Sequence, residues 1–180
     1  MKSKNFYIKF ICVFLLSLHI ASTKIKAKDT LLTNAIIHTI SGPTYSPGFV
    51  LINGDQIKSV GPVSKQPKLK NVTTIDLKKQ HLFPGIIATT TALGLMEIAA
   101  VRATVDTNEV GTYTPEVKSW IAINPDSELI PVSRANGITH FLPTPQGGTI
   151  AGQSGLMRTV GWGYENMTHK PSVALHLYWP

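Results

Sequence analysis

The segment LFPGIIATTTA, residues 82–92, indicates how the chain folds beyond residue 82. Pro84 and Gly85 interrupt the preceding structure, and the apolar run that follows predicts a buried strand that begins a new structural unit. Residues two apart on a strand point the same way, so Thr90 and Ala92 are expected to lie side by side. A threonine hydroxyl is a poor ligand for a divalent metal at neutral pH, and an alanine methyl is none.

The residues before this segment predict short strands. Residues 31–40 are rich in Leu and Ile, and two further strands at 49–52 and 56–60 flank the turn Asn53-Gly54-Asp55. Asn-Gly tolerates positive φ at both central positions of a type I′ turn and therefore predicts a hairpin. Residues 72–77 predict a further strand, after an exposed, lysine-rich linker at 64–71.

After residue 84 the pattern changes to alternating strands and helices. Asn124 followed by Pro125 and acidic residues predicts a helix start, and Gly137 predicts its end. Pro131 is expected to kink this helix or delay its start. Residues 138–142 then predict the next parallel strand, and residues 143–154 a loop rich in Gly and polar side chains.

Several segments beyond the first strand resemble one family. They are GLMEI (94–98), AVRAT (100–104), NPDSELIP (124–131) and RANGIT (134–139). Together with residues 82–92 they resemble the metal-dependent amidohydrolases, in particular a secreted bacterial branch related to imidazolonepropionase-like proteins. The resemblance covers about residues 30–180. The superfamily pattern PG-[FLI]-I-D-x-H-x-H places Ala88 at its Asp, Thr90 at its first metal-binding His and Ala92 at its second.

The resemblance implies an α/β fold with a small N-terminal β-sandwich-like domain at residues 28–82. The first βα units of an incomplete TIM-type barrel are expected to follow at residues 83–180. Such a barrel takes about 250 residues, whereas 180 − 83 = 97 residues follow Phe83. Because the chain also stops in an apolar, strand-like run at 172–180, we expect it to be the N-terminal portion of a larger protein.

Residues 1–27 predict a secretory signal peptide. Lys2, Lys4 and Lys9 form a basic start, and residues 10–20 form an apolar core that is too short for a membrane span. Cleavage after residue 27 would deliver the mature chain to the periplasm or the extracellular space. Cys12 lacks the small preceding residue of a lipoprotein, and no cysteine remains after cleavage, so neither a lipid anchor nor a disulfide is expected.

The charge of the mature chain does not indicate nucleic-acid binding. The chain has 17 Lys and Arg residues and 10 Asp and Glu residues. Five of the lysines lie in residues 1–27, which leaves 17 − 5 = 12 basic residues and a net charge of 12 − 10 = +2. No basic run or basic patch with interleaved aromatic residues is present.

The histidines are the remaining candidates for metal ligands. His140 lies on a predicted strand and His176 on the last apolar segment, and a structural role is the simpler interpretation of each. His38 and His81 fall in the first domain and are expected at its surface or interface, and His169 falls in a polar loop.

A charged group follows the first barrel strand: Glu97, Arg102, Asp106 and Glu109. These residues could orient a substrate at the barrel rim, where acid–base chemistry would require a perturbed carboxylate. Ordinary ion pairs on a surface are the simpler interpretation.

Two other patterns fail as catalytic motifs. The glycine-rich residues 146–155 match neither GxGxxG nor GxxxxGK[ST], and a tight loop explains them more simply. Ser154 does not lie in a GxSxG nucleophile elbow. The sequons at Asn71 and Asn166 are discounted because the rest of the sequence resembles bacterial proteins.

Three hypotheses follow. The resemblance implies an exported hydrolase of carbon–nitrogen bonds other than peptide bonds, acting on an amide or cyclic amide. Because Thr90 and Ala92 stand at the metal-binding positions, this chain alone is expected to be catalytically silent. Alternatively it is a non-catalytic homologue that binds a metal-competent amidohydrolase-like sibling subunit. A truncated product with an unpaired sheet edge is the third. No catalytic residue, metal ligand or cofactor site is assigned, and neither nucleic acid nor, after cleavage, a membrane is expected as a partner.

Overall fold

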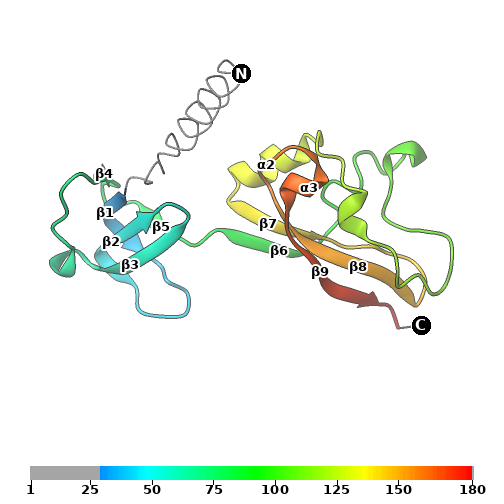
Figure 1. Cartoon of the computed structure of the whole chain (residues 1–180), viewed down its shortest axis with the longest axis horizontal. Coiled ribbons are helices and arrows are strands. Elements are labelled where there is room, and N and C mark those ends of the chain that lie inside the picture. The colour runs from blue at the N-terminus through cyan, green and yellow to red at the C-terminus, as the bar shows by residue number, and fades with distance from the viewer. Residues whose placement is uncertain (1–28, 180) are drawn as a thin grey trace, which may run out of the picture. The chain divides into compact units, whose positions relative to one another are not determined.

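The computed structural model describes residues 29–179, so the predicted signal peptide lies outside the described residues. The chain divides between Phe83 and Pro84 into two compact units. Both units consist mainly of strands, with few and short helices (Figure 1). No helix within residues 29–179 is long and apolar enough to span a membrane.

The first unit is one five-stranded sheet. Its strands are β1 (Thr30–Ile37), β2 (Tyr45–Asn53), β3 (Gln56–Pro62), β4 (Thr73–Asp76) and β5 (His81–Leu82), with a short 3₁₀ helix η1 (Val63–Lys65) after β3. The strand order is β3-β2-β1-β4, and β5 also pairs with β1. β2 is antiparallel to β1 and β3, whereas β4 and β5 are parallel to β1.

The resemblance implies a composite sandwich whose second layer would come from strands outside this unit, and the described residues of this unit form a single sheet. The core of the unit is formed by alternate residues of β1, among them Leu31 and Ile37, and by Phe49 and Leu51 of β2. All four residues of β4 are exposed. Residues 29–83 therefore form a single layer whose buried side chains come mainly from β1 and β2.

The β2–β3 hairpin was predicted correctly, but its turn type was not. Asn53 pairs with Gln56, so the two central residues of the turn are Gly54 and Asp55. Gly54 has φ +61°, whereas Asp55 does not have a positive φ. Positive φ at the first central residue alone is typical of a type II′ turn, in which glycine occupies that position. Gly54 is thus the first central residue, whereas the type I′ prediction took Asn53 as the first and Gly54 as the second.

The second unit is a four-stranded sheet in the order β6-β7-β8-β9. Its strands are β6 (Ile86–Thr91), β7 (Ile138–Pro143), β8 (Ile150–Arg158) and β9 (Thr168–Leu177). The helical segments are η2 (Arg102–Thr104), η3 (Ser119–Ile121), α2 (Leu129–Ala135) and α3 (Gly163–Met167). β6 and β7 are parallel, as expected of a βα unit, and α2 lies between them in the chain.

The expectation of further βα units is wrong for the next two strands. β7 and β8 are antiparallel, and so are β8 and β9. A parallel crossover needs a dozen or more residues, whereas only residues 144–149 connect β7 to β8. The predicted loop 143–154 is accordingly too long, because β8 begins at Ile150.

Helix α2 begins at Leu129, later than the Asn124 start indicated. The Oδ1 atom of Asn124 accepts a hydrogen bond from the backbone N–H of Asp126 at 3.0 Å, which stabilises a turn before the helix. Pro131 then occupies the third helical position, where its missing N–H costs no intrahelical hydrogen bond. Its position confirms the expected delay, and Gly137 follows the helix with φ +91°.

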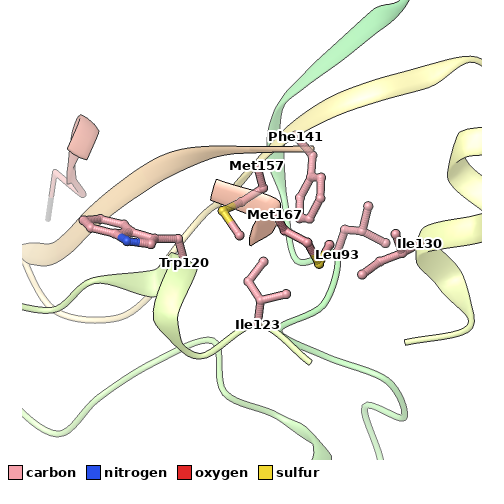
Figure 2. Close-up of a cluster of buried hydrophobic side chains, with 7 residues drawn as sticks. All are labelled: Leu93, Trp120, Ile123, Ile130, Phe141, Met157 and Met167. Carbon is pink, nitrogen blue, oxygen red and sulfur yellow. The ribbon is translucent and has the colours of Figure 1, made fainter. Parts of the chain in front are cut away.

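The core of the second unit lies on one face of its sheet (Figure 2). Phe141 of β7 and Met157 of β8 point from the sheet toward side chains of α2, α3, η3 and the segment after β6. The cluster contains Leu93, Trp120, Ile123, Ile130, Phe141, Met157 and Met167. β6 was predicted to be buried, but Ile86 and Ile87 are 57% and 50% exposed, because β6 is an outer strand of this sheet with only β7 beside it.

Candidate functional site

The carboxyl ends of β6 and β7 are joined through Thr91 and Thr144. The carbonyl oxygen of Thr91 accepts a hydrogen bond from the backbone N–H of Thr144 at 2.8 Å. The backbone N–H of Thr91 donates to Thr144 Oγ1 at 3.3 Å. In (β/α) barrels the active site forms at this end of the parallel strands, so functional residues are expected here.

Local backbone groups use the hydroxyls of both threonines. Thr91 Oγ1 accepts from the backbone N–H of Leu93 at 3.1 Å, and Thr144 Oγ1 donates to the carbonyl oxygen of Leu142 at 3.2 Å. Thr144 is also buried. These hydroxyls shape the chain where it leaves the sheet.

The residues at this strand end do not fit a divalent metal held in the manner of an HxH pair. Thr90 is exposed and offers a neutral hydroxyl, Ala92 offers a methyl group, and Ala88 packs against the hydrophobic core. Zinc prefers imidazole, thiolate and carboxylate ligands. Within residues 29–179, no group of three or more His, Cys, Asp or Glu side chains could hold a metal ion.

His140 lies on β7, beside Arg158 of β8 and His169 of β9. Its Nδ1 is 3.1 Å from Thr139 Oγ1, and its ring meets that of His169 edge-on at a centroid distance of 5.3 Å. Partial burial, and then the charges of His169 and Arg158, lower the pKa of His140. His169 was expected in a polar loop but lies on β9, and no motif pointed to Arg158, because only the strand register brings the three together.

His176 contacts Ser154 across the β8–β9 pair. Its Nε2 lies 2.8 Å from Ser154 Oγ, and burial lowers the pKa of His176. In enzymes with a serine nucleophile, an adjacent histidine activates the hydroxyl by acting as a general base. The Ser154 side chain is fully buried, however, so no substrate can reach its hydroxyl in this arrangement.

His38 and His81 form a pair in the first unit. His38 Nε2 lies 2.9 Å from His81 Nδ1, and the His38 ring stacks on Phe83 at a centroid distance of 4.3 Å. The backbone N–H of His38 donates to the carbonyl oxygen of Leu82 at 2.9 Å, which fixes the register of β5 beside β1. His81 is exposed and His38 is half-buried.

The four charged residues after β6 do not form one group. Asn124 Nδ2 donates to Glu97 Oε1 at 3.4 Å, and Arg102 Nη1 donates to the carbonyl oxygen of Val105 at 2.6 Å. Asp106 and Glu109 instead line an open cavity of about 420 Å³. The structure therefore brings only the last two of these residues to one site.

This cavity lies in the long segment between β6 and α2. Its other charged lining residues are Glu116 and Lys118, and buried Ser119 forms part of its wall. Ser119 Oγ donates to the carbonyl oxygen of Pro143 at 2.5 Å, which ties this wall to the end of β7. No sequence motif marked residues 116–122, so sequence reasoning missed this half of the cavity.

The glycine-rich residues 146–155 form a short loop and the first part of β8. At Gly152, a Cβ atom would lie 2.8 Å from Cβ of Val117. At Gly155, it would lie 3.1 Å from the Trp120 ring. These glycines permit close packing of the preceding segment against β8, so the prediction of a tight loop is wrong for residues 150–155, which belong to a strand.

Compared by sequence, the chain matches no protein-family model and no curated protein. Compared by structure, it is similar to the crystal structure of an amidohydrolase from Thermotoga maritima MSB8, with a TM-score of 0.74 and 25% sequence identity. That match covers 82% of this chain and 38% of the other. A second structure, of an uncharacterized protein, is 21% identical over 39% of this chain and 17% of its own, and its TM-score of 0.34 supports no argument. The Thermotoga structure supports the resemblance to the amidohydrolase superfamily, of which this chain spans well under half of one member's length.

Proposed function

We propose that the chain is an exported amidohydrolase-like protein of the branch that lacks the HxH pair. The observation that supports this function is the structural similarity to the Thermotoga amidohydrolase over 82% of the chain. By that resemblance the reaction class is hydrolysis of carbon–nitrogen bonds other than peptide bonds. Because Thr90 and Ala92 cannot replace two imidazoles, we infer that this chain is catalytically silent on its own.

Turnover measurements test this silence. Purified residues 28–180 are incubated with zinc and a panel of lactams, cyclic ureas and dipeptides, and products are measured by liquid chromatography with mass spectrometry. We expect no product above the protein-free blank. Hydrolysis that co-purifies with the chain and is lost in the Thr90→Val variant would show that β6 does carry a working site.

Export is proposed from the basic and apolar pattern of residues 1–27. Expression of the full chain in a bacterium, followed by osmotic release of the periplasm, measures it. We expect the released chain to begin at Lys28 by intact mass. A full-length chain that stays in the cytoplasmic fraction would contradict export.

A second candidate function, assembly with an amidohydrolase-like sibling subunit, is favoured by the apolar residues at both edges of the second sheet. On β9, the alternating residues Val173, Leu175 and Leu177 are 43%, 49% and 66% exposed. Ile86 and Ile87 are exposed on β6, the opposite outer strand. Exposed apolar outer strands pair with other chains unless they are covered. In a closed barrel each strand has a neighbour on both sides, so no strand edge is left uncovered. The match to the Thermotoga structure covers only 38% of that chain, and in this proposal the sibling subunit covers the outer strands β6 and β9.

Gentle co-purification from the source cells tests the sibling subunit. We expect a retained chain that mass spectrometry identifies as amidohydrolase-like and that carries the HxH pair. The double variant Leu175→Asp, Leu177→Asp should lose it. Val160→Asp, at an exposed position in the connection after β8, is the matched control and should retain it. Recovery of the chain without such a subunit would count against assembly.

A further inference from the structure

Three basic side chains from three neighbouring strands meet on the second unit's sheet. They are His140 of β7, Arg158 of β8 and His169 of β9. His140 and Arg158 are direct partners in the β7–β8 pair. Their chain neighbours Phe141 and Met157 point into the hydrophobic core, and side chains alternate between the faces of a sheet. His140 and Arg158 therefore project from the face opposite the core.

The hydrogen bonds of the cluster fix which atoms remain available. Arg158 Nη2 lies 3.1 Å from His169 Nδ1. A guanidinium has only donors, so His169 Nδ1 accepts this hydrogen bond and its Nε2 carries the proton. His140 Nδ1 is engaged with Thr139 Oγ1 at 3.1 Å. The remaining N–H groups of Arg158, and the Nε2 atoms of both imidazoles, are then the groups that an outside ligand would meet.

The charges in this cluster have one sign. Besides partial burial, the groups that lower the pKa of His140 are His169 and Arg158, and no carboxylate is among them. Its partner on β6 is the apolar Ile87. Like charges directly opposite each other on neighbouring strands destabilise a sheet. An arrangement that places basic groups side by side, as His140, Arg158 and His169 are here, is stabilised when an anion binds.

We propose that His140, Arg158 and His169 form a binding site for a doubly charged tetrahedral oxyanion, of the sulfate or phosphate type. Charge-assisted N–H···O hydrogen bonds are about twice as strong as neutral ones, and a guanidinium can bind two oxygens of one anion at once. The three residues stand on adjacent strands of one sheet, which holds them in place before the ligand arrives. Arg158 and His169 are exposed, so an anion can reach them. This site is independent of the function proposed above.

Titration with sodium sulfate, followed by the imidazole proton signals in NMR spectra, tests the site. The protein is the chain without its leader, at constant ionic strength maintained with sodium chloride. Variants His140→Gln and His169→Gln assign the two signals. We expect saturable shifts of both signals, and tighter binding at pH 6 than at pH 7.5. The bound anion favours protonated His140, whose Nδ1 can then donate to Thr139 Oγ1, and sulfate stays doubly charged over this range.

Matched variants separate the site from general attraction of anions. Arg158→Gln should weaken sulfate binding by roughly tenfold, the effect of losing one charge-assisted contact. Arg102→Gln removes another exposed arginine, whose contact is with the carbonyl oxygen of Val105, and should leave the affinity unchanged. Both variants are first checked for a native amide spectrum.

Three results would overturn the proposal. One is shifts that do not saturate, and a second is equal weakening in the Arg158 and Arg102 variants. The third is binding of singly charged acetate as tight as that of sulfate, because the site is argued to fit a doubly charged anion. Phosphate at pH 7.5 should bind with an affinity similar to that of sulfate.

Discussion

His176 Nε2 lies 2.8 Å from Ser154 Oγ, and this contact joins the two last strands of the chain through their side chains as well as their backbones. Ser154 is fully buried and His176 is half-buried. Burial disfavours the charged imidazolium, so it lowers the pKa of His176 below its usual 6.5. The pKa of His140 is lowered in the same direction.

The second unit should lose stability as pH falls from 7 toward 5. Below pH 6.5 these imidazoles take up protons in the unfolded chain before they do so in the folded one, because their folded pKa values are lower. The unfolded state then binds more protons, and the free energy of unfolding decreases with falling pH. Urea denaturation followed by tryptophan fluorescence measures this effect, since Trp120, Trp162 and Trp179 all lie beyond residue 84.

The double variant His140→Gln, His176→Gln is the control for this pH dependence. Its free energy of unfolding should change less between pH 7 and pH 5 than that of the native chain. The hydrogen bond from the backbone N–H of Lys78 holds the pKa of Asp76 below its usual 3.8. The measurement is kept at pH 5 and above so that protonation of this carboxylate does not add to the effect of the histidines. An unchanged slope in the variant would show that other groups cause the pH dependence.

Replacement of Phe141 by alanine should reduce the free energy of unfolding of the second unit by about 3–5 kcal/mol, the usual cost of a buried phenylalanine. Phe141 is fully buried in the core cluster, to which several helical segments also contribute side chains (Figure 2). Urea denaturation gives the value. Val132→Ala, on the exposed side of α2, should stay within about 0.5 kcal/mol of the native chain. Similar losses in both variants would mean that this cluster is not the core.

Two glycines with positive φ should respond differently to alanine. Gly137 has φ +91° and open space where a Cβ would lie, so Gly137→Ala should cost about 1–2 kcal/mol for the backbone conformation alone. Gly148 has φ +65°, and its Cβ would lie 2.7 Å from the carbonyl oxygen of Thr112. Gly148→Ala should therefore cost about 1–3 kcal/mol more. Thermal unfolding compares the pair, and equal losses would contradict the packing of residue 148 against residue 112.

Local sequence signals predicted the elements whose cause is local. The Asn53-Gly54 dipeptide gave the hairpin and Pro131 gave the late start of α2, because both act on the backbone within a few residues. The parallel pairing of residues 138–142 with β6 was also predicted and is confirmed. The turn type was missed because it depends on which pair closes the turn, and that pair is Asn53 with Gln56.

Features that depend on contacts between distant segments were missed. Residues 150–154 resemble a loop because of their glycines, yet Gly152 serves close packing against Val117 within a strand. The contact between Ser154 and His176, and the cluster of His140 with Arg158 and His169, both depend on the register of antiparallel strands. Register depends on which face is buried, and the burial of β8 is decided by the segment around Trp120.

The proposal that the carboxyl end of β6 carries no metal site is tested most directly by metal analysis. The chain without its leader is incubated with zinc chloride and dialysed extensively. Its zinc content is then measured by inductively coupled plasma mass spectrometry. We expect well below one zinc per chain, because Thr90 and Ala92 offer a hydroxyl and a methyl group where two imidazoles would be required. One zinc per chain that survives dialysis and disappears in Thr90→Val would contradict this reading of β6.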